Sequence, residues 1–540
     1  MNGDDTVSFN LVDRPWLTAR TRHGHEVELS LLDVFRRSHE VTALLGDVPT
    51  QVFALTRLLL AVLHRALRGP QDFEEWAGYW QDGLPVDKIA DYLAVHRHRF
   101  DLLDGELPFM QVPGLRTAKD EVSELDRLIA DVPNGHPYFT TRLGGVKTLS
   151  FAEAARWLVH CHAFDPSGIK SGAADDPRTK QGKGYPIGTG WAGNLGGVVP
   201  VGKSLRDTLL LNLLPYHDDA DLPAWERDRF DPVKDAVDGL TPTGRVDLYT
   251  WQSRRIRLTH DGQQVTGVLI CNGKPLGPQN RSEVEPHTAW RRSQAQEKKL
   301  RKPLVYMPRE HDPQKAVWRG LQPLLPGAVP PQGKDAAPFL TPGVVEWVAE
   351  VEDVIGEDYF VRLHTVGMTY GAQSATTTEI IDDVVALHAV LLRRADLAHT
   401  AVDCVRDAEN AARALGKLAR NLGEAAGYRP DPRAKPGTRD GVRDQALELA
   451  YASMDPLFRK WLREVTADTE PLQARADWHR AAWGVIHRLG KDMLDRAPVA
   501  AWTGRVANKR FITSSHAYRW FLNDLRTALP FANADFEVTS

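Results

Sequence analysis

The sequence predicts an α+β fold, with a mixed α/β N-terminal domain over residues 1–370 and a C-terminal four-helix bundle over residues 371–540. Three observations support this prediction. Strand-like and helix-like segments alternate with long loops up to about residue 370. Apolar residues then recur at helical spacing almost to the end of the chain. The length of 540 residues also exceeds the roughly 250–300 residues at which a single hydrophobic core stops growing.

The N-terminal domain is predicted from short elements in chain order. Residues 9–19 (FNLVDRPWLTA) indicate a short strand that enters a turn at Pro15, and helices are expected at 31–35, 52–67 and 150–159. The β-prone runs RRIRLTH and QQVTGVLI flank Asp261-Gly262, which is the strongest kind of short-range hairpin signal. Another strand is expected from Tyr359 to Met368. Segments 165–197 and 322–343 are rich in Gly, Pro or Lys and are expected to be loops.

The C-terminal bundle is predicted from four amphipathic segments. Thr376 and Glu379 form a capping-box signature, and apolar residues follow at 4-3-4 spacing as far as Leu391. Further apolar stripes mark helices at 405–422, 449–461 and 472–493, with a polar linker at 428–441 and a short last helix at 515–529 that could dock on the others. Because none of these helices can bury its stripe alone, a bundle is expected.

Composition excludes several classes of protein. Cys161, Cys271 and Cys404 lie far apart without a CxxC pair, so neither a cysteine-rich zinc site nor a disulfide scaffold is expected. No apolar run approaches the roughly 20 residues that span a bilayer, and the N-terminus carries acids where a signal peptide carries bases. A cytoplasmic protein without a metal, a cofactor or a membrane partner is therefore expected. The net charge of −4 does not by itself indicate nucleic-acid binding.

Two glycine motifs follow one another in the loop after Gly182. Residues 188–193 match GxGxxG, and residues 197–204 match the Walker A pattern, so a nucleotide-binding enzyme that uses Lys203 and Ser204 is one alternative. No strand–loop–helix context is visible around either motif, and Pro200 with its neighbouring valines suits an extended segment. The alternatives are a flexible surface loop leading into a helix at 205–213, or a groove in which glycines let a nucleic-acid backbone approach.

Basic residues gather in several places despite the acidic net charge. Arg413, Lys417 and Arg420 share one helical face and are candidates for DNA-backbone contacts. Three further groups are basic, namely Arg291, Arg292, Lys298, Lys299, Arg301 and Lys302; Lys170, Arg178, Lys180 and Lys183; and Arg429, Arg433, Lys435 and Arg439. A solvated charged surface is the plain alternative for any one of them. Histidines give no metal-binding or hydrolase motif.

Several segments together resemble the CasA-type large subunit of the type I-E CRISPR Cascade complex. They are FNLVDRPWLTARTRHGHEVELSL near the start, LPFMQ at 107–111, GTGWAGNLGGVVPVGKSLRDTLLLN from Gly188, and VGMTYGAQSATTTE before the predicted bundle. The order of these segments is more specific than any one of them. The resemblance implies an α/β domain followed by a four-helix bundle, in agreement with the prediction made from the residues.

The resemblance also implies a function without catalysis. Such a subunit reads a short PAM in double-stranded DNA, helps to open the duplex for R-loop formation, and recruits a helicase–nuclease in antiviral defense. Its partners would be the other Cascade subunits with their crRNA, the target DNA and that effector. The residues that match the family's reading elements are a glycine loop (Ile187, Gly188, Thr189, Gly190), a wedge (Gln373 with Ala372), a lysine finger (Lys274) and a DNA-contacting loop at 134–145. A scaffold whose bundle binds only other proteins is a further alternative.

Overall fold

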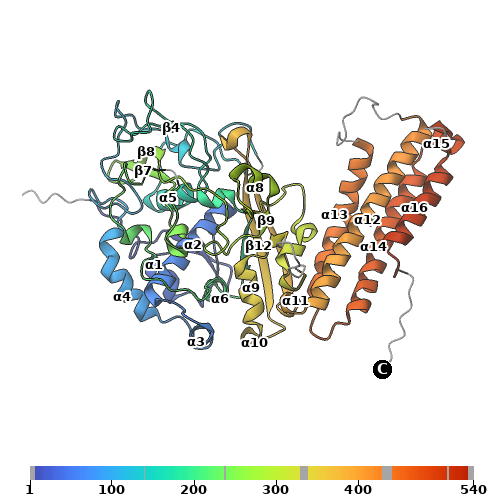
Figure 1. Ribbon diagram of the computed structural model, residues 1–540, viewed down its shortest axis with the longest axis horizontal. Helices are drawn as coiled ribbons and strands as arrows, with labels where there is room; N and C mark the ends of the chain where they lie inside the picture. The colour runs from blue at the N-terminus through green and yellow to red at the C-terminus, as the bar shows by residue number, and fades with distance from the viewer. Residues whose placement is uncertain are drawn as a thin grey trace, which may run out of the picture. The chain divides into compact units, whose positions relative to one another are not determined.

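The computed structural model describes residues 7–138, 140–235, 237, 239–328, 338–428, 441–507 and 510–532. The chain divides into two compact units, one formed by Met1–Lys315, Pro330–Ile355 and Val361–Val384, and the other by Ala316–Val329, Gly356–Phe360 and Val385–Ser540. We call them the N-terminal and C-terminal units. The chain crosses from the N-terminal to the C-terminal unit for the last time after Val384, whereas the domain boundary predicted from the sequence is at residue 370. Figure 1 shows the course of the chain.

Helix α2 (Pro49–Leu67) forms the centre of the N-terminal unit. Its apolar residues are buried on almost every side, and it packs against α4, α5, α6 and α7. By length and composition it could cross a membrane, but most of its apolar window is buried inside the protein, as in a core helix. Figure 1 shows α2 near α1 (Leu31–Arg36), α4 (Val86–His96), α5 (Phe151–Phe164) and α6 (Leu205–Leu211). The other helices of this unit are α3 (Phe73–Asp82), α7 (Arg245–Tyr249), α8 (Gln294–Leu300), α9 (Gly343–Glu350) and α10 (Glu352–Ile355).

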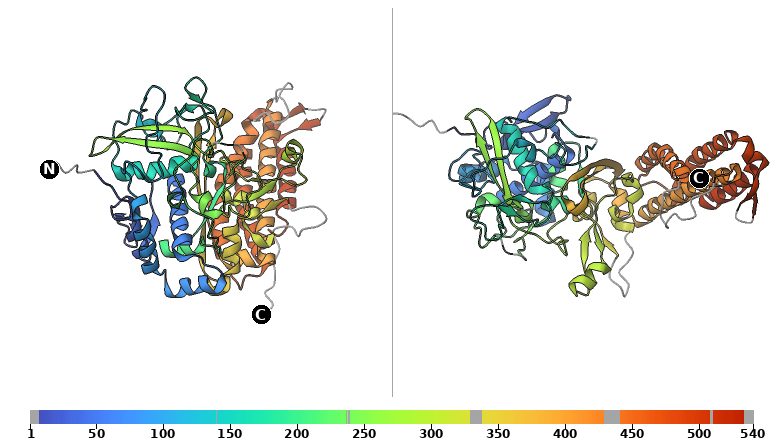
Figure 2. Two further views of the ribbon diagram at one scale, coloured as in Figure 1. Left: turned by 60° about the vertical axis from the view of Figure 1, so that its left-hand side comes forward. Right: turned by 90° about the horizontal axis from the view of Figure 1, so that it is seen from above.

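Small antiparallel sheets surround these helices. Their orders are β2-β1-β3, β13-β12-β6, β10-β9-β11, β4-β5 and β7-β8. The strands are β1 (Leu17–Thr21), β2 (Glu26–Leu29), β3 (Val41–Leu44), β4 (Lys170–Ser171), β5 (Lys183–Gly184), β6 (Gly197–Val201), β7 (Arg254–His260), β8 (Val265–Asn272), β9 (Trp290–Arg292), β10 (Tyr306–Pro308), β11 (Phe339–Leu340), β12 (Phe360–Tyr370) and β13 (Thr377–His388). Figure 2 shows the long β7–β8 hairpin running beside α5.

Most local predictions for the N-terminal unit are confirmed. The β7–β8 hairpin turns at Asp261-Gly262, and α5 begins with a complete capping box formed by Ser150 and Glu153. One boundary is wrong, because the first strand was expected before Pro15. Residues 11–13 form a turn instead, and β1 starts only at Leu17.

The expected helix at 376–391 is wrong, because Thr377–His388 is strand β13, which pairs with β12. Seven of the ten residues from Thr376 to Val385 are β-branched, so this run fits a pleated strand better than a helix. In the strand, Val385 and Leu387 are buried on one face. Over so short a run, apolar spacing of 4-3-4 does not distinguish the 3.6-residue period of a helix from the two-residue period of a strand.

The C-terminal unit is mainly helical among its described residues. The long helix α12 packs against α13, α14 and α16, and these four helices run side by side in Figure 1. Their buried side chains include Leu415, Phe458, Trp478 and Phe521. The elements are α11 (Val390–Arg393), α12 (Ala395–Ala426), α13 (Gly441–Glu464), α14 (Pro471–Asp495), α15 (Val499–Thr503), a hairpin of β14 (Arg505–Ala507) and β15 (Arg510–Ile512), and α16 (Ser514–Ala528). Most of the expected linker lies outside the described residues.

Candidate functional site

The predicted glycine loop, Ile187–Gly190, lies between β5 and the 3-10 turn Trp191–Asn194. Gly188 has a φ of +106° and is exposed, and a Cβ built on it would meet no atom within 4 Å. Gly190 is different, since its Cβ would lie 2.5 Å from the carbonyl carbon of Ala163. Gly190 is therefore needed for packing against the end of α5, whereas Gly188 leaves space into which a ligand backbone could come.

A buried ion pair between Arg254 and Asp165 holds the glycine loop. The Arg254 side chain is 1% exposed, and its Nε donates to the Asp165 carboxylate. Its Nη2 donates to the carbonyl oxygens of Asp165 (3.2 Å), Pro166 (3.1 Å) and Gly188 (2.8 Å). Gly190 donates its own amide to the Asp165 carbonyl at 2.9 Å. One guanidinium thus joins strand β7, the end of α5 and the glycine loop.

The charge balance at this ion pair favours the ionised carboxylate. Burial alone would raise the pKa of Asp165, but the positive charges of Lys170 and Arg254 outweigh it and hold that pKa below its ordinary value. The Lys170 ammonium lies 2.6 Å from the same carboxylate oxygen. Two cations therefore share one anion beside the glycine loop, and the cluster carries a net positive charge.

A second buried ion pair supports the loop from its other end. Trp191, which follows Gly190 directly, donates its indole Nε1–H to Glu285 at 2.6 Å. Arg57 donates two hydrogen bonds to the same carboxylate, at 2.7 and 2.8 Å. Burial would raise the pKa of Glu285, but the Arg57 charge holds it well below its ordinary range. The glycine loop is therefore fixed at both ends by buried charged groups.

The predicted wedge residues lie at the tip of the β12–β13 hairpin. Ala372 and Gln373 are exposed, and Gln373 and Ser374 have φ angles of +57° and +53°. Residues other than Gly, Asn and Asp rarely adopt this left-handed backbone conformation, so the tip is a strained turn. It was expected to connect a strand to a helix; because β13 is a strand, it closes a hairpin instead, with Gly371 N–H donating to Thr376 O at 2.8 Å.

The glycine loop and the hairpin tip meet the same short segment, residues 165–167. Ser167 donates its amide to the carbonyl of Ser374 in the tip at 2.7 Å, while the Asp165 carbonyl accepts from Gly190. The predicted DNA-contacting loop at 134–145 also reaches the tip, since a Cβ on Gly135 would lie 3.2 Å from the Thr376 side chain. Three segments that are far apart in the sequence are thus neighbours in the structure.

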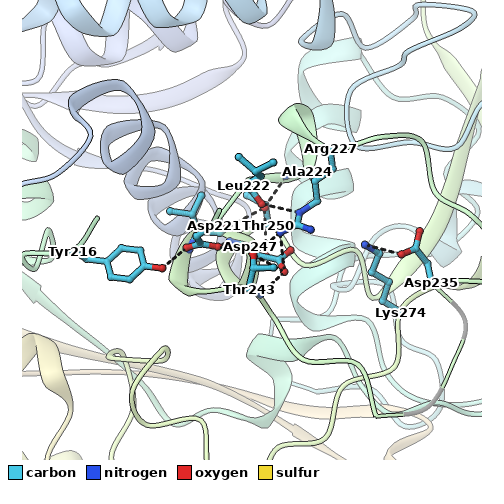
Figure 3. A network of polar contacts seen from close by, with 11 residues as sticks. Tyr216, Asp221, Leu222, Ala224, Arg227, Asp235, Thr243, Asp247, Thr250 and Lys274 are labelled. Atoms are coloured by element: carbon cyan, nitrogen blue, oxygen red, sulfur yellow. Dashed lines mark hydrogen bonds and ion pairs between the residues drawn. The ribbon is translucent and has the colours of Figure 1, made fainter. Parts of the chain in front are cut away.

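Lys274 lies close to this group but is already engaged. Asn272, two residues earlier, donates its side-chain amide to Tyr185 O at 2.6 Å, just before the glycine loop. The Lys274 ammonium lies 3.2 Å from Asp235, and its side chain is 14% exposed. Figure 3 shows this pair beside the network described next. A phosphate or base would therefore compete with Asp235 for the Lys274 charge.

The network of polar contacts in Figure 3 holds α7 in place, and the segment after α7 contacts Lys274. The buried Asp221 accepts from the Tyr216 hydroxyl at 2.8 Å and from the first amides of α7, at Val246 (2.7 Å) and Asp247 (2.9 Å). Arg227 lies 3.2 Å from the Asp247 carboxylate, whose pKa is raised by burial despite that positive charge. Residues 251 and 252 follow α7 and bond to the backbone of Lys274.

The Walker A pattern at 197–204 begins as a buried strand and does not form a phosphate-binding loop. Gly197–Val201 is β6, whose backbone pairs with Arg362–Val366 of β12. Ser204 caps α6 by accepting from the Asp207 amide at 3.1 Å. The interpretation as a flexible surface loop was wrong, and the extended conformation expected from Pro200 is confirmed. The last glycine of the GxGxxG match, Gly193, packs against Tyr370, so this glycine, like Gly190 and unlike Gly188, serves packing.

The three predicted backbone-contacting residues on α12 are exposed but neutralised. Arg413 pairs with Glu409 at 3.0 Å, Lys417 with Asp524 at 2.9 Å, and Arg420 with Glu424 at 3.1 Å. In the group around residue 291, Arg292 pairs with Glu297. Arg429, Arg433, Lys435 and Arg439 lie outside the described residues. Helical spacing showed that the three basic residues share a face of α12. It could not show that carboxylates on α12 and on α16 neutralise their charges.

Metal ligands are not clustered in the part of the chain that the structure describes. No group of three or more His, Cys, Asp or Glu side chains there could hold a metal ion. Cys161, Cys271 and Cys404 are buried and unpaired, and burial raises the pKa of the Cys271 thiol to about 12. The site therefore consists of backbone, glycines and a few charged side chains. Sequence reasoning missed Arg254 and Asp165; the only signal was arginines at inward-facing positions of a predicted strand.

Comparisons with known proteins point in one direction. A family model described as CRISPR-associated protein Cse1 matches residues 10–489. The crystal structure of Thermobifida fusca Cse1 is similar over 98% of this chain and 99% of its own, with 46% identity and a TM-score of 0.89. CasA/Cse1 of Thermus thermophilus is 32% identical over 293 residues, 52% of this chain and 55% of that protein, so the match spans about half of that curated relative. A chain from a CRISPR RNA-guided surveillance complex shares the fold, with 20% identity and a TM-score of 0.64 over 96% of this chain and 99% of its own.

Proposed function

The chain belongs to the CRISPR-associated Cse1 family, and we propose that it is the non-catalytic large subunit of a type I-E CRISPR surveillance complex (Cascade) that recognises the PAM in double-stranded DNA. In this role the guide RNA reads the target by base pairing, and the protein reads only the short PAM. The other Cascade subunits and their crRNA are its partners, and its place is the cytoplasm, where guide RNA and invading DNA meet.

The observation that carries this proposal is the meeting of two predicted reading elements at residues 165–167. Gly190 of the glycine loop and Ser374 of the hairpin tip both bond to this segment. Arg254 joins the segment to the carbonyl of the exposed Gly188. A glycine with open space beside it lets the backbone approach the floor of a groove. The minor groove suits a glycine backbone as the reading element. Its base edges present few distinguishing groups, so several PAM sequences could be accepted by the same loop.

The hairpin tip is proposed to open the duplex beside the PAM. Gln373 is exposed and held in a strained turn, so its side chain is presented without further ordering of the backbone. Unstacking a base step costs a few kcal/mol, and a side chain that fills the gap offsets part of this cost. Opening then exposes the first target bases to the guide RNA, which begins R-loop formation.

The charged residues are proposed to act by exchanging partners. Lys274 would leave Asp235 for a DNA group as the lysine finger, and Arg413, Lys417 and Arg420 would exchange carboxylates for phosphates along α12. Such contacts position DNA but carry no sequence information. We further propose that α12, α13, α14 and α16 constitute a four-helix bundle, and that this unit helps to recruit the helicase–nuclease that degrades the target.

The test compares Gly188→Ala with Gly24→Ala in the assembled, guide-loaded complex. Both glycines have positive φ, +106° and +83°, with open space at the Cβ position, so both substitutions impose the same kind of backbone strain, about 1–2 kcal/mol. Only Gly188 lies in the proposed reading loop. Gly188→Ala is expected to weaken binding to a PAM-bearing duplex about tenfold, which corresponds to about 1.4 kcal/mol. Binding to a duplex without PAM should change little, and Gly24→Ala should leave both affinities unchanged.

Two results would contradict the proposal. The first is equal loss of affinity in both variants, which would mean that strain anywhere in the unit has the same effect. The second is a Gly188→Ala complex that discriminates PAM-bearing from PAM-less DNA as well as the wild type does.

A further inference from the structure

The β14–β15 hairpin of the C-terminal unit presents an apolar face to solvent. Val506 and Phe511 are direct cross-strand partners, so they point to the same side, and they are 70% and 52% exposed. On the opposite face Ile512 is buried with Ala425 and Ala501. Trp502 on the preceding α15 is exposed as well. The inner face therefore packs on the rest of the unit, whereas Val506 and Phe511 on the outer face are largely exposed.

Planar side chains continue from this face onto α16. Phe511 meets His516 edge-on with ring centroids 6.4 Å apart, and His516 stacks on Trp520 at 5.9 Å with only 13° between the planes. The guanidinium of Arg510 lies 3.4 Å from the centroid of the Trp520 ring. His516 and Trp520 are four residues apart on one helix, so they share a face. Three rings and a guanidinium thus follow one another across the surface.

This part of the chain is also free of acids. Between Arg496 and Asn523 the sequence has no Asp or Glu, but it has the basic residues Arg496, Arg505, Lys509, Arg510 and Arg519. Arg505 is used internally, donating to the last carbonyls of α12 at Ala425 (3.1 Å) and Ala426 (2.9 Å). Arg519 is exposed and forms no ion pair with any residue that the structure describes. The contrast is with Arg413, Lys417 and Arg420, each of which has a carboxylate partner.

We propose that this surface, formed by Trp502, Val506, Phe511, His516 and Trp520 with Arg510 and Arg519, binds an unpaired DNA strand. Of its rings, those of Trp502 and Phe511 are exposed and those of His516 and Trp520 are half-buried. Accessible rings beside arginines without ion pairs are the combination that binds single strands without sequence preference, since bases stack on the rings and phosphates meet the cations. The proposal goes beyond PAM reading, and only the source of the strand, a duplex opened by the complex, rests on the proposed function. The competing occupant is an acidic protein segment with apolar side chains.

The experiment measures binding of the full-length chain to a fluorescein-labelled oligothymidine by fluorescence anisotropy. A length of about 20 nucleotides exceeds usual single-strand site sizes. Phe511→Ala is expected to weaken binding about tenfold, within the range for losing one stacked base. Phe511→Trp should keep the wild-type affinity because it keeps a ring. Phe511→Leu should weaken binding almost as much as Phe511→Ala, because leucine keeps apolar area but cannot stack. The matched control is Leu449→Ala, an exposed apolar residue on α13, which should change nothing.

The charge component is measured from the salt dependence of the same binding. Arg519→Gln should reduce the slope of log affinity against log salt concentration by about 0.7, the contribution of one phosphate contact in a single strand. Circular dichroism of each variant checks that the helices remain folded. A slope unchanged by Arg519→Gln would contradict a phosphate contact at this residue.

Three outcomes would overturn the proposal. Absence of oligothymidine binding at low salt is the first. Wild-type affinity of Phe511→Leu is the second, and it would favour an apolar docking face for a protein segment. Tighter binding of an oligouridine RNA than of the DNA is the third, because it would make RNA the occupant. The oligonucleotide contains no PAM, so PAM discrimination by the assembled complex is scored separately and Phe511→Ala is expected to retain it.

Discussion

Replacing Arg254 should weaken both the fold and the reading of the PAM. Arg254→Met removes the pair with Asp165 and the hydrogen bonds to three carbonyl groups, including the one at Gly188. Breaking a buried ion pair by removing one partner costs about 3–5 kcal/mol. Lys170 remains 2.6 Å from Asp165 and keeps its charge paired, so the free energy of unfolding should fall by about 3 kcal/mol, the lower end of this range. Urea unfolding of the isolated chain measures this loss.

The effect on DNA follows from the tether to the glycine loop. The bond from Arg254 to Gly188 O is charge-assisted, a class that contributes about 1.5–3 kcal/mol. If binding must order the freed loop, the affinity for PAM-bearing DNA should fall by at least about tenfold. Arg254→Lys keeps the charge but cannot reach all these acceptors, so it should restore stability more than PAM discrimination.

Arg156→Met supplies the matched control. Arg156 is also buried; it donates to Trp16 O at 2.7 Å and lies 3.7 Å from Glu28, away from the glycine loop. This variant should lose stability and keep PAM discrimination. If Arg254→Met and Arg156→Met altered PAM discrimination to the same extent, Arg254 would be an ordinary structural residue and the reasoning would be refuted.

Three more predictions use strand-opening kinetics, binding and pH. Gln373→Ala should slow R-loop formation on linear DNA and leave PAM-dependent encounter nearly intact, with partial rescue by negative supercoiling; equal opening rates would remove Gln373 from the mechanism. Asp235→Asn should tighten DNA binding several-fold by releasing Lys274, and an unchanged or weaker affinity would count against this lysine finger. Burial lowers the pKa of His162 and His287 to about 4, so the unfolded chain takes up protons that the folded chain does not. Each should cost about 2 kcal/mol of stability between pH 7 and pH 5, as checked by urea unfolding at both values.

Local signals in the sequence predicted much of the N-terminal unit. The Asp261-Gly262 turn and the Ser150 cap act within a few residues, so their patterns are visible without the fold. The failure at Thr377–His388 has the opposite origin. This segment becomes a strand because β12 lies beside it, and partner strands are not visible in a single sequence. The β-branched residues favour a strand there, whereas the apparent capping box and the 4-3-4 spacing favour a helix.

The same limit applies to the site. Gly188 and Gln373 were found by resemblance, while Arg254 and Asp165, which hold the site together, are 89 residues apart and were not found. A carboxylate after α5 and an arginine in a strand look like ordinary surface residues in the sequence. Only their burial shows that they act as a pair, since a buried charge is retained only where a partner compensates its desolvation. Sequence patterns can thus identify groups that face a ligand more readily than groups that fix those residues in place.

Charge illustrates this point in the helical unit. Spacing selected Arg413, Lys417 and Arg420 as a basic face, yet each has a carboxylate within 3.1 Å, so DNA must compete with a pair already made. Arg519 does not belong to a basic face defined by spacing, but it has no acid within four residues in sequence and no ion pair among the described residues. A phosphate gains more from a cation without a partner, because no existing pair is lost in exchange. In a protein of net charge −4, the cations that lack partners are therefore better candidates for nucleic-acid contact than the cations that are most numerous along one face.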